Sequence, residues 1–195
     1  MTGWGQALPE FLPDVQVANH AMAGRSSKSF LYEGRFIPVE QALQPGDLVL
    51  IQFAHNDESA FRWRHTEPWA GYIHNLNLYI QTARLREAVP VLLTPICQRI
   101  FQEGVLQPGH AGYLEAVRTL ATQTGTPLID LYSHSFASVQ AAGEAGSDPW
   151  YMNLQPGVWP GYPEGRVDNT HTTAAGAKVY AAYVSEQLQA LGLVR

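Results

Sequence analysis

The stretch Leu48-Val49-Leu50-Ile51-Gln52-Phe53 decides the fold, because it is a nearly unbroken apolar run of strand length. A second run of the same kind is Val89-Pro90-Val91-Leu92-Leu93-Thr94. Strands buried on both faces of a parallel sheet have this composition, whereas half-exposed strands alternate apolar and polar residues. Residues 15–19 and 128–131 are weaker apolar segments and predict two further strands.

Helical periodicity fills the sequence between these runs. Apolar residues recur at helical spacing in four segments, which are residues 4–12, 69–83, 116–120 and about 173–191. The first of these helices is expected to end at Pro13. Strands that alternate with amphipathic helices predict an α/β fold, a three-layer doubly wound parallel sheet. Residues 143–165, rich in Gly, Pro and Trp, predict a long loop, and such loops are usually functional or mobile.

Composition limits the partners of the chain. A length of 195 residues with 46% hydrophobic content suits a single domain over residues 1–195. The formal charge of -5, with scattered basic residues, argues against a nucleic-acid partner. Cys97 is the only cysteine, which excludes an internal disulfide, and no zinc-ligand spacing is present. No cofactor or metal is expected.

The sequence as given shows neither a membrane-spanning segment nor a signal peptide. No apolar run approaches the roughly 20 residues of a membrane span. The N-terminus lacks the charged and apolar regions of a signal peptide. A cytoplasmic location is therefore expected for the chain as given, with secretion left open because the N-terminus is expected to be incomplete. The oligomeric state is not predicted.

Polar motifs follow the predicted strands. They are Asn19-His20-Ala21-Met22-Ala23-Gly24-Arg25-Ser26-Ser27, then His55-Asn56-Asp57, and then Asp168-Asn169-Thr170-His171 before the last helix. In doubly wound folds, ligands gather at the carboxyl ends of the strands. An Asp and a His three residues apart can supply the orienter and the general base of a hydrolytic triad, provided that a serine reaches the imidazole. The motifs therefore indicate a hydrolytic site.

Each motif also has a simpler structural interpretation. Asp168 and His171 alone fit a loop before a helix, in which Thr172 or Thr173 is the cap. Asn56-Asp57 is suited to a turn, because these side chains bond their own backbone. Only the order of the motifs along the chain favours a catalytic site over these interpretations.

The possible substrate contacts are equally open. His55 suits either packing or the lining of a sugar pocket. Arg25 and Arg35 suit either surface ion pairs or contacts to a uronate carboxylate. Four tryptophans, at 63, 69, 150 and 159, suit either carbohydrate stacking or the anchoring of loops.

In this order, the motifs resemble those of the SGNH, or GDSL-type, hydrolase superfamily, and within it the rhamnogalacturonan acetylesterase-like branch. The resemblance extends over almost the whole chain and includes Gly3-Trp4-Gly5, Glu33-Gly34-Arg35-Phe36 and Leu93-Thr94-Pro95. It implies a flavodoxin-like fold and a serine esterase that removes O-acetyl groups from a pectin-type carbohydrate. One departure is Ala54, where the family usually has glycine.

The resemblance implies a role for each motif. Asp168 is the orienter and His171 the general base, while the Gly24 backbone N–H and the Asn56 amide form the oxyanion hole. His55 and Arg25 are candidate substrate-binding residues. The family's nucleophilic serine belongs to a Gly-Asp-Ser block at the end of a first strand, and this block is absent from the chain.

Three explanations for the missing block are open. The first is that the start codon is assigned too far downstream, and we favour this explanation. The second is that the missing strand is supplied from elsewhere or that the sheet is rearranged. The third is that the protein is a pseudoenzyme. In the related strand order 2-1-3-4-5 the first strand lies between two others, so its loss would leave backbone groups unpaired. The serines within the chain at 26, 27, 29 and 147 are expected to be structural.

Two alternatives to an acetylesterase of this kind remain. One is an esterase of other small acyl esters, and the other is a non-catalytic sugar-binding protein that kept the cleft. A flavodoxin-like nucleotide binder is disfavoured, because no Gly-rich phosphate-binding fingerprint follows the first predicted strand. The expected partner is a small acylated saccharide.

Overall fold

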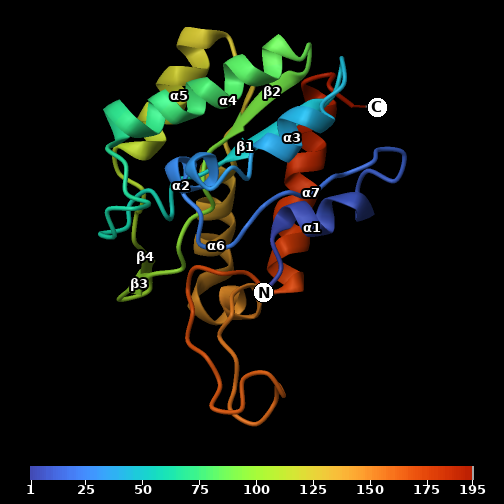
Figure 1. Cartoon of the computed structure of the whole chain (residues 1–195). Coiled ribbons are helices and arrows are strands. Elements are labelled where there is room, and N and C mark those ends of the chain that lie inside the picture. Colours follow the sequence, from blue (N-terminus) through green and yellow to red (C-terminus); the bar gives the residue numbers. More distant parts are fainter. Residues whose placement is uncertain (195) are drawn as a thin grey trace. The chain divides into compact units, whose positions relative to one another are not determined.

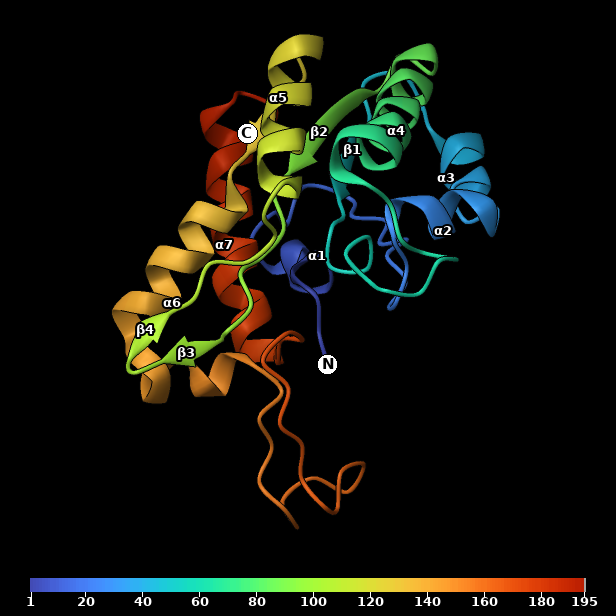
Figure 2. The same ribbon diagram turned by 90° about the vertical axis from the view of Figure 1, so that its left-hand side faces the viewer.

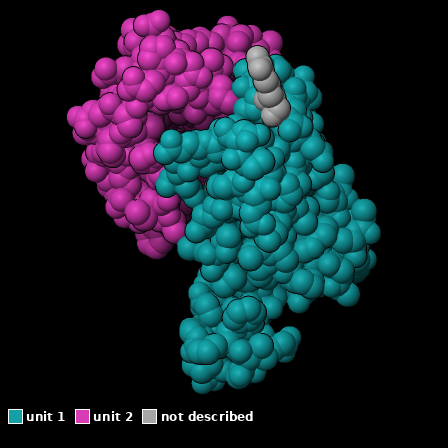
Figure 3. Space-filling model, turned by 90° about the vertical axis from the view of Figure 1, so that its right-hand side faces the viewer, with its two compact units in different colours: residues 1–19, 96–109, 131–195 teal, residues 20–95, 110–130 magenta. Residues whose placement is uncertain are grey.

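The structure is a computed structural model, and it describes residues 1–194. The chain divides into two compact units (Figure 3). Unit 1 comprises residues 1–19, 96–109 and 131 to the C-terminal end, and unit 2 comprises residues 20–95 and 110–130. Figure 1 shows the elements in their order along the chain. The single domain predicted from the sequence stays a prediction.

Unit 2 contains a parallel sheet with the order β1-β2-β5, formed by β1 (Leu48–Gln52), β2 (Val89–Leu93) and β5 (Leu128–Ile129). Leu48 pairs with Val89 and Leu92 with Leu128. The two apolar runs thus form neighbouring strands, and the predicted α/β class with a parallel sheet is confirmed. β1 is an edge strand of this sheet, although Val49 and Ile51 are buried.

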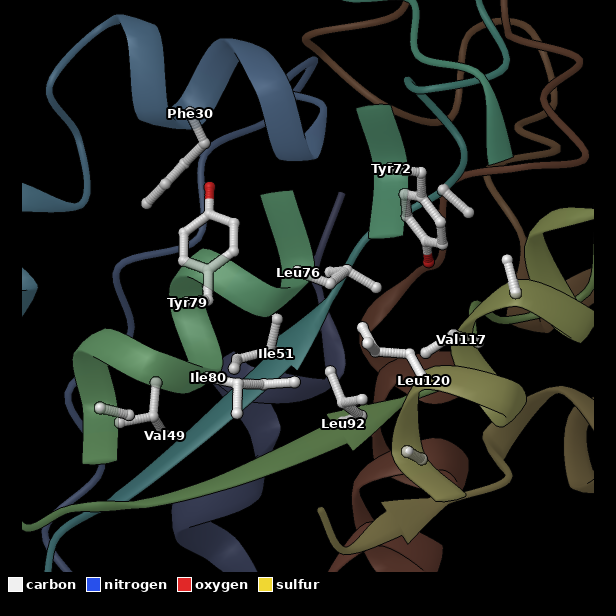
Figure 4. Close-up of a cluster of buried hydrophobic side chains, with 14 of the residues drawn as sticks. Phe30, Val49, Ile51, Tyr72, Leu76, Tyr79, Ile80, Leu92, Val117 and Leu120 are labelled. Atoms are coloured by element: carbon white, nitrogen blue, oxygen red, sulfur yellow. The ribbon is translucent and has the colours of Figure 1, made fainter. Parts of the chain in front are cut away.

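Helices cover one face of this sheet. They include α4 (Ile73–Leu85), which continues from a wide π turn, η2 (Pro68–Tyr72), and α5 (Tyr113–Thr124). Figure 4 shows the resulting core, in which Leu76 and Ile80 of α4 meet Ile51, Leu92 and Leu120. Neighbouring residues of β2, on the opposite face by strand alternation, are also fully buried. Burial of both faces explains why the strand sequence is apolar throughout.

Two short helices precede β1 in unit 2. They are α2 (Ser27–Tyr32) and α3 (Ile37–Ala42). Ser26 is the N-cap of α2, because its Oγ accepts the Ser29 N–H at 3.1 Å, and the Ser29 Oγ accepts the Ser26 N–H at 2.9 Å. This reciprocal cap gives a six-residue helix a defined start.

Unit 1 is mainly helical and contains a small hairpin. Its elements are α1 (Trp4–Ala7), η1 (Leu8–Glu10), β3 (Phe101–Gln102), β4 (Val105–Leu106), α6 (Leu131–Ser147), η3 (Asp148–Trp150) and α7 (Ala174–Ala190). β3 and β4 are antiparallel, and Gly143 interrupts the helical backbone of α6. α7 packs against α1 and α6. Of the two predicted caps of the last helix, Thr172 and Thr173, the cap is Thr173, whose Oγ1 accepts the Gly176 N–H at 3.3 Å.

Residues 153–167 form an extended segment, hereafter the arm, which projects from the ends of α6 and α7 in Figure 2. Its two sides are joined at the base, where Leu154 and Arg166 exchange backbone hydrogen bonds of 2.7 and 2.9 Å. Gly165 is required there, because its φ is +74° and a Cβ would lie 2.5 Å from the Leu154 carbonyl oxygen. The base of the arm therefore has a fixed register.

Several predicted elements differ from the structure. The strand at 15–19 is wrong, because this segment is irregular and pairs with no strand among the described residues. The predicted fourth strand ends at Ile129, and Leu131 already begins α6. The loop predicted from 143 starts in the last turn of α6. A strand needs a partner, which a local apolar pattern does not supply.

Candidate active site

The Asp168–His171 pair is formed in unit 1, between the arm and α7. His171 Nδ1 lies 2.8 Å from Asp168 Oδ2. Asp168 Oδ1 accepts the backbone N–H groups of Thr170 at 3.0 Å and His171 at 2.9 Å. The side chain of His171 is 44% exposed and that of Asp168 only 10%. The backbone N–H groups thus fix the carboxylate, and the imidazole is exposed to solvent. An exposed imidazole oriented by a carboxylate suits a general base.

The surroundings of Asp168 keep its carboxylate ionised. Partial burial raises its pKa, but the backbone N–H groups of His171 and Thr170, followed by the His171 side chain, outweigh burial and lower the pKa to about 2. Arg166 Nη2 also donates to Oδ2. The amide of Asn153 steadies the loop, since its Oδ1 accepts the Asp168 N–H at 2.8 Å. A negative charge at this position stabilises an imidazolium.

The second predicted pair, Gly24 and Asn56, lies in unit 2. Asn56 Nδ2 donates to the carbonyl of Arg25 at 3.2 Å, so the amide lies beside the residue that follows Gly24. Gly24 has a φ of +77°, in the left-handed region that favours glycine. The structure therefore brings the two predicted oxyanion donors to neighbouring backbone positions.

Arg64 fixes the orientation of the Asn56 amide. Its Nη1 donates to Asn56 Oδ1 at 3.0 Å. Guanidinium groups only donate and carbonyls only accept, so these two contacts together require that the NH2 group faces Arg25. One of its two N–H bonds is used there. The Arg64 guanidinium is also stacked near the rings of Phe61 and Trp63, at 5.2 and 5.3 Å.

Asp57 ties the two loops of this pair together. Its carboxylate is fully buried and accepts the Ser27 N–H at 3.0 and 3.2 Å, the Ser27 hydroxyl at 2.5 Å and the Thr66 hydroxyl at 2.8 Å. Burial raises the pKa of Asp57, although these donors act in the opposite direction. The carboxylate therefore connects the residues next to Gly24 with the residues next to Asn56.

The two candidate substrate-binding residues make contacts within unit 2. The ring of His55 lies edge-on to the ring of His110, with centroids 4.4 Å apart, and His110 Nδ1 lies 2.5 Å from Glu58 Oε1. Arg25 Nε donates to Glu33 Oε2 at 3.0 Å, and Arg35 binds the same oxygen. These contacts fit the packing and ion-pair interpretations, and substrate binding by His55 and Arg25 stays a prediction.

The four serines considered as internal nucleophiles are all buried, with exposures of 0–2%. Ser26 and Ser29 form the cap of α2, and Ser27 donates to Asp57. The Ser147 hydroxyl donates to the Gly143 carbonyl at 2.7 Å and accepts from Arg99 Nε at 3.1 Å. These hydroxyls have structural roles, as the sequence predicted.

Among residues 1–194, no group of three or more His, Cys, Asp or Glu side chains is arranged to hold a metal ion. None of the helices within the same range has the length and apolar character needed to cross a bilayer. Sequence reasoning missed Arg64, which contacts Asn56 in unit 2, and Arg166 and Asn153, which contact Asp168 in unit 1, because none of the three belongs to a motif.

A parallel α/β sheet combined with a carboxylate–histidine pair before the last helix is typical of ester hydrolases. The GDSL-like lipase/acylhydrolase family model matches residues 1–179. The chain belongs to this family, and by family it is a carboxylic ester hydrolase.

Named relatives are similar over most of the chain. Rhamnogalacturonan acetylesterase RhgT of Bacillus subtilis is 37% identical over 99% of this chain and 83% of its own length. A rhamnogalacturonan acetylesterase of Emericella nidulans is 44% identical over 92% of this chain and 75% of its own length. These similarities place the chain beside the rhamnogalacturonan acetylesterase branch.

Solved structures share the fold. Protein YXIM of Bacillus subtilis superposes with a TM-score of 0.81 at 26% identity, over 98% of this chain and 51% of that protein, so the chain spans about half of its length. The acetylxylan esterase Axe2 of Geobacillus stearothermophilus superposes with a TM-score of 0.64 at 18% identity, over 100% of this chain and 84% of that enzyme. The predicted flavodoxin-like fold of the superfamily is confirmed.

Proposed function

We propose that this protein removes O-acetyl groups from rhamnogalacturonan by a Ser-His-Asp mechanism. His171 is the general base, Asp168 orients and stabilises it, and the Gly24 N–H and the Asn56 amide bind the oxyanion. The observation that carries the proposal is the 2.8 Å contact between His171 Nδ1 and Asp168 Oδ2 with the imidazole exposed. The substrate is inferred from the relatives named rhamnogalacturonan acetylesterases.

The nucleophile in this proposal is a serine outside the 195 residues. Two observations support this: the four candidate serines are buried and hydrogen-bonded, and β1 is an edge strand of its sheet although Val49 and Ile51 are buried. One more parallel strand at that edge would pair its backbone groups. A serine at the carboxyl end of such a strand would follow the rule that ligands bind at this edge of the sheet.

The proposed chemistry is that of a Ser-His-Asp triad. The serine Oγ attacks the acetyl carbonyl as His171 removes its proton, and the oxyanion that forms is bound by the two donors. As the acetyl C–O bond to the sugar breaks, His171 gives the proton to the departing sugar oxygen, which leaves as a free hydroxyl. Water, activated by the same imidazole, hydrolyses the acetyl-serine and releases acetate.

The test compares three polypeptides in a single assay of acetate release from acetylated rhamnogalacturonan. They are the 195-residue chain, the same chain extended by the residues that the gene encodes upstream, and the extended chain with His171→Ala. We expect activity only in the second. Activity of the 195-residue chain, with a fluorophosphonate label located on one of its own serines, would overturn the external nucleophile.

A non-catalytic sugar-binding protein is the second candidate, and the burial of the four serines favours it. It predicts that the extended chain binds rhamnogalacturonan oligosaccharides without releasing acetate. A panel of aryl and longer-chain esters separates the third candidate, an esterase of other small esters, from both.

A further inference from the structure

Asp168 Oδ2 has two cationic or potentially cationic partners. His171 Nδ1 lies 2.8 Å from this oxygen, and Arg166 Nη2 donates to the same atom. The other oxygen, Oδ1, is occupied by the N–H groups of Thr170 and His171. Arg166 is therefore placed to compete with the imidazole for one carboxylate oxygen.

We propose that Arg166 is a positioning residue which, by sharing Asp168 Oδ2 with His171, weakens the hold of the carboxylate on the protonated imidazole and keeps His171 usable as a base in acidic solution. The inference rests on the proposed function, in which His171 must be neutral to accept the serine proton. A fixed positive charge behind the carboxylate offsets part of its negative potential at the imidazole. Protonation of His171 is then less favourable than beside an unpaired aspartate.

Arg166 is held in place by its backbone and by the Tyr162 side chain. Its backbone is bonded to Leu154 at the base of the arm, and its Cζ lies 5.6 Å from the centre of the Tyr162 ring. Nη1 donates to the Tyr162 hydroxyl at 3.4 Å, and the side chain is 32% exposed. Burial disfavours the charge on Arg166, but Asp168 outweighs burial and raises the pKa of the guanidinium. Arg166 thus stays cationic.

The charged groups around this pair define what else acts on it. A cavity of about 600 Å³ next to the dyad is lined by Arg166 together with Arg99, Glu144, Asp148 and Glu164. Arg99 is paired with Asp148 at 3.2 Å, so its charge is balanced locally. Among residues 1–194, Arg166 is the only arginine or lysine in an ion pair with Asp168. Removal of Arg166 is therefore the direct way to change the charge behind the carboxylate.

The test is an NMR pH titration of the imidazoles in the 195-residue chain, in which the His171 signal is assigned by its loss in His171→Gln. We expect Arg166→Gln to move the His171 titration midpoint to higher pH, by roughly threefold or more in proton affinity. Arg166→Lys, which retains the charge, should stay close to the unchanged protein. Lys178→Gln removes another cation, paired with Glu10, and should not move the midpoint.

An unmoved midpoint in Arg166→Gln, or an equal shift in Lys178→Gln, would overturn the proposal. The backbone signals of Thr170 and His171 report whether the loop keeps its bonds to Asp168 in each variant. If Arg166→Gln disturbs these backbone signals, Arg166→Lys is the deciding variant. A shift of the His171 midpoint in Arg166→Lys would overturn the proposal, because it would show that geometry rather than charge matters. The titration needs no hydrolysis, so it can fail or succeed independently of the proposed activity.

Discussion

Asp57 and Asp168 are both carboxylates beside predicted site residues, but their surroundings are opposite. Asp57, in unit 2, is fully buried and accepts hydrogen bonds from neutral groups that include Ser27 and Thr66, and burial raises its pKa. Asp168, in unit 1, is 10% exposed, faces Arg166 and His171, and has a pKa of about 2. At Asp57 the hydrogen-bond donors do not offset full burial, whereas at Asp168 the two backbone donors and the His171 side chain outweigh partial burial.

The difference separates two tasks. Asp57 fixes the positions of two loops, for which the number of hydrogen bonds matters more than the charge. Asp168 must stay ionised to orient and stabilise an imidazolium, for which the charge is essential. Variants of the two residues should therefore respond differently to loss of the acceptor and to pH.

Replacement of Asp57 by alanine is expected to have the largest effect on folding, a loss of about 3 kcal/mol in the free energy of unfolding. The Ser27 N–H, the Ser27 hydroxyl and the Thr66 hydroxyl would lose their acceptor, and each buried unpaired donor costs at least about 1 kcal/mol. Asp57→Asn keeps one acceptor oxygen and should lose only about 1 kcal/mol. Urea denaturation measures both, and equal losses would show that the charge, not the acceptor, is required.

Replacement of Asn56 by alanine in the N-terminally extended polypeptide should lower kcat by about 100- to 1000-fold, with little change in KM, because one oxyanion donor is lost. Arg64→Ala leaves the amide but removes the contact that orients it, so a smaller loss on the order of 10-fold is expected. Steady-state kinetics with an acetyl ester measures both. Full activity in Asn56→Ala would remove this residue from the oxyanion hole.

Asp168 should contribute stability that depends on pH. Its folded-state pKa, about 2, lies below the ordinary value of 3.8, so its contribution is present above the ordinary value and is lost as the pH falls towards 2. The difference corresponds to about 2 kcal/mol. Urea denaturation between pH 2 and 5 should show this slope in the unchanged chain and a flatter one in Asp168→Asn; parallel curves would contradict it.

Asp57 should act with the opposite sign. Its pKa is raised in the folded state, so its contribution is present below the ordinary value and decreases as the pH rises through the folded-state pKa. In the same urea series, the free energy of unfolding of the unchanged chain should fall as the pH rises through the folded-state pKa of Asp57. Asp57→Asn should lack this fall.

The smallest expected effect is at Ala54, which is buried and has a φ of +144°. This conformation is strained for alanine, and glycine removes the strain at the cost of chain entropy and one buried methyl group. Ala54→Gly should therefore stabilise the fold by less than about 1 kcal/mol. Ala83→Gly, at a buried position near the C-terminal end of α4, is the control and should destabilise the fold. Thermal unfolding measures the stability of both variants, and a lower unfolding temperature in Ala54→Gly would contradict the strain at Ala54.

The sequence predicted the elements that carry a strong local signal. The two apolar runs became β1 and β2, the periodicity at 69–83 became η2 and α4, and Thr173 is the cap of α7. The strand predicted at 15–19 is irregular, because pairing with a neighbour decides whether an apolar segment forms a strand. α6 was missed, since its small and polar residues give little helical periodicity.

For the candidate site residues, the motifs, their order and the residue types that suit ester hydrolysis can be read from the amino-acid sequence. The groups that support these residues could not be predicted, because they come from other parts of the chain. Arg64 bonds to Asn56 from eight positions along the chain, Asn153 reaches Asp168 from fifteen positions away, and Ser27 meets Asp57 across thirty. Motifs record chemistry that is local in sequence, whereas burial, charge pairing and hydrogen-bond supply depend on which distant segments the fold brings together.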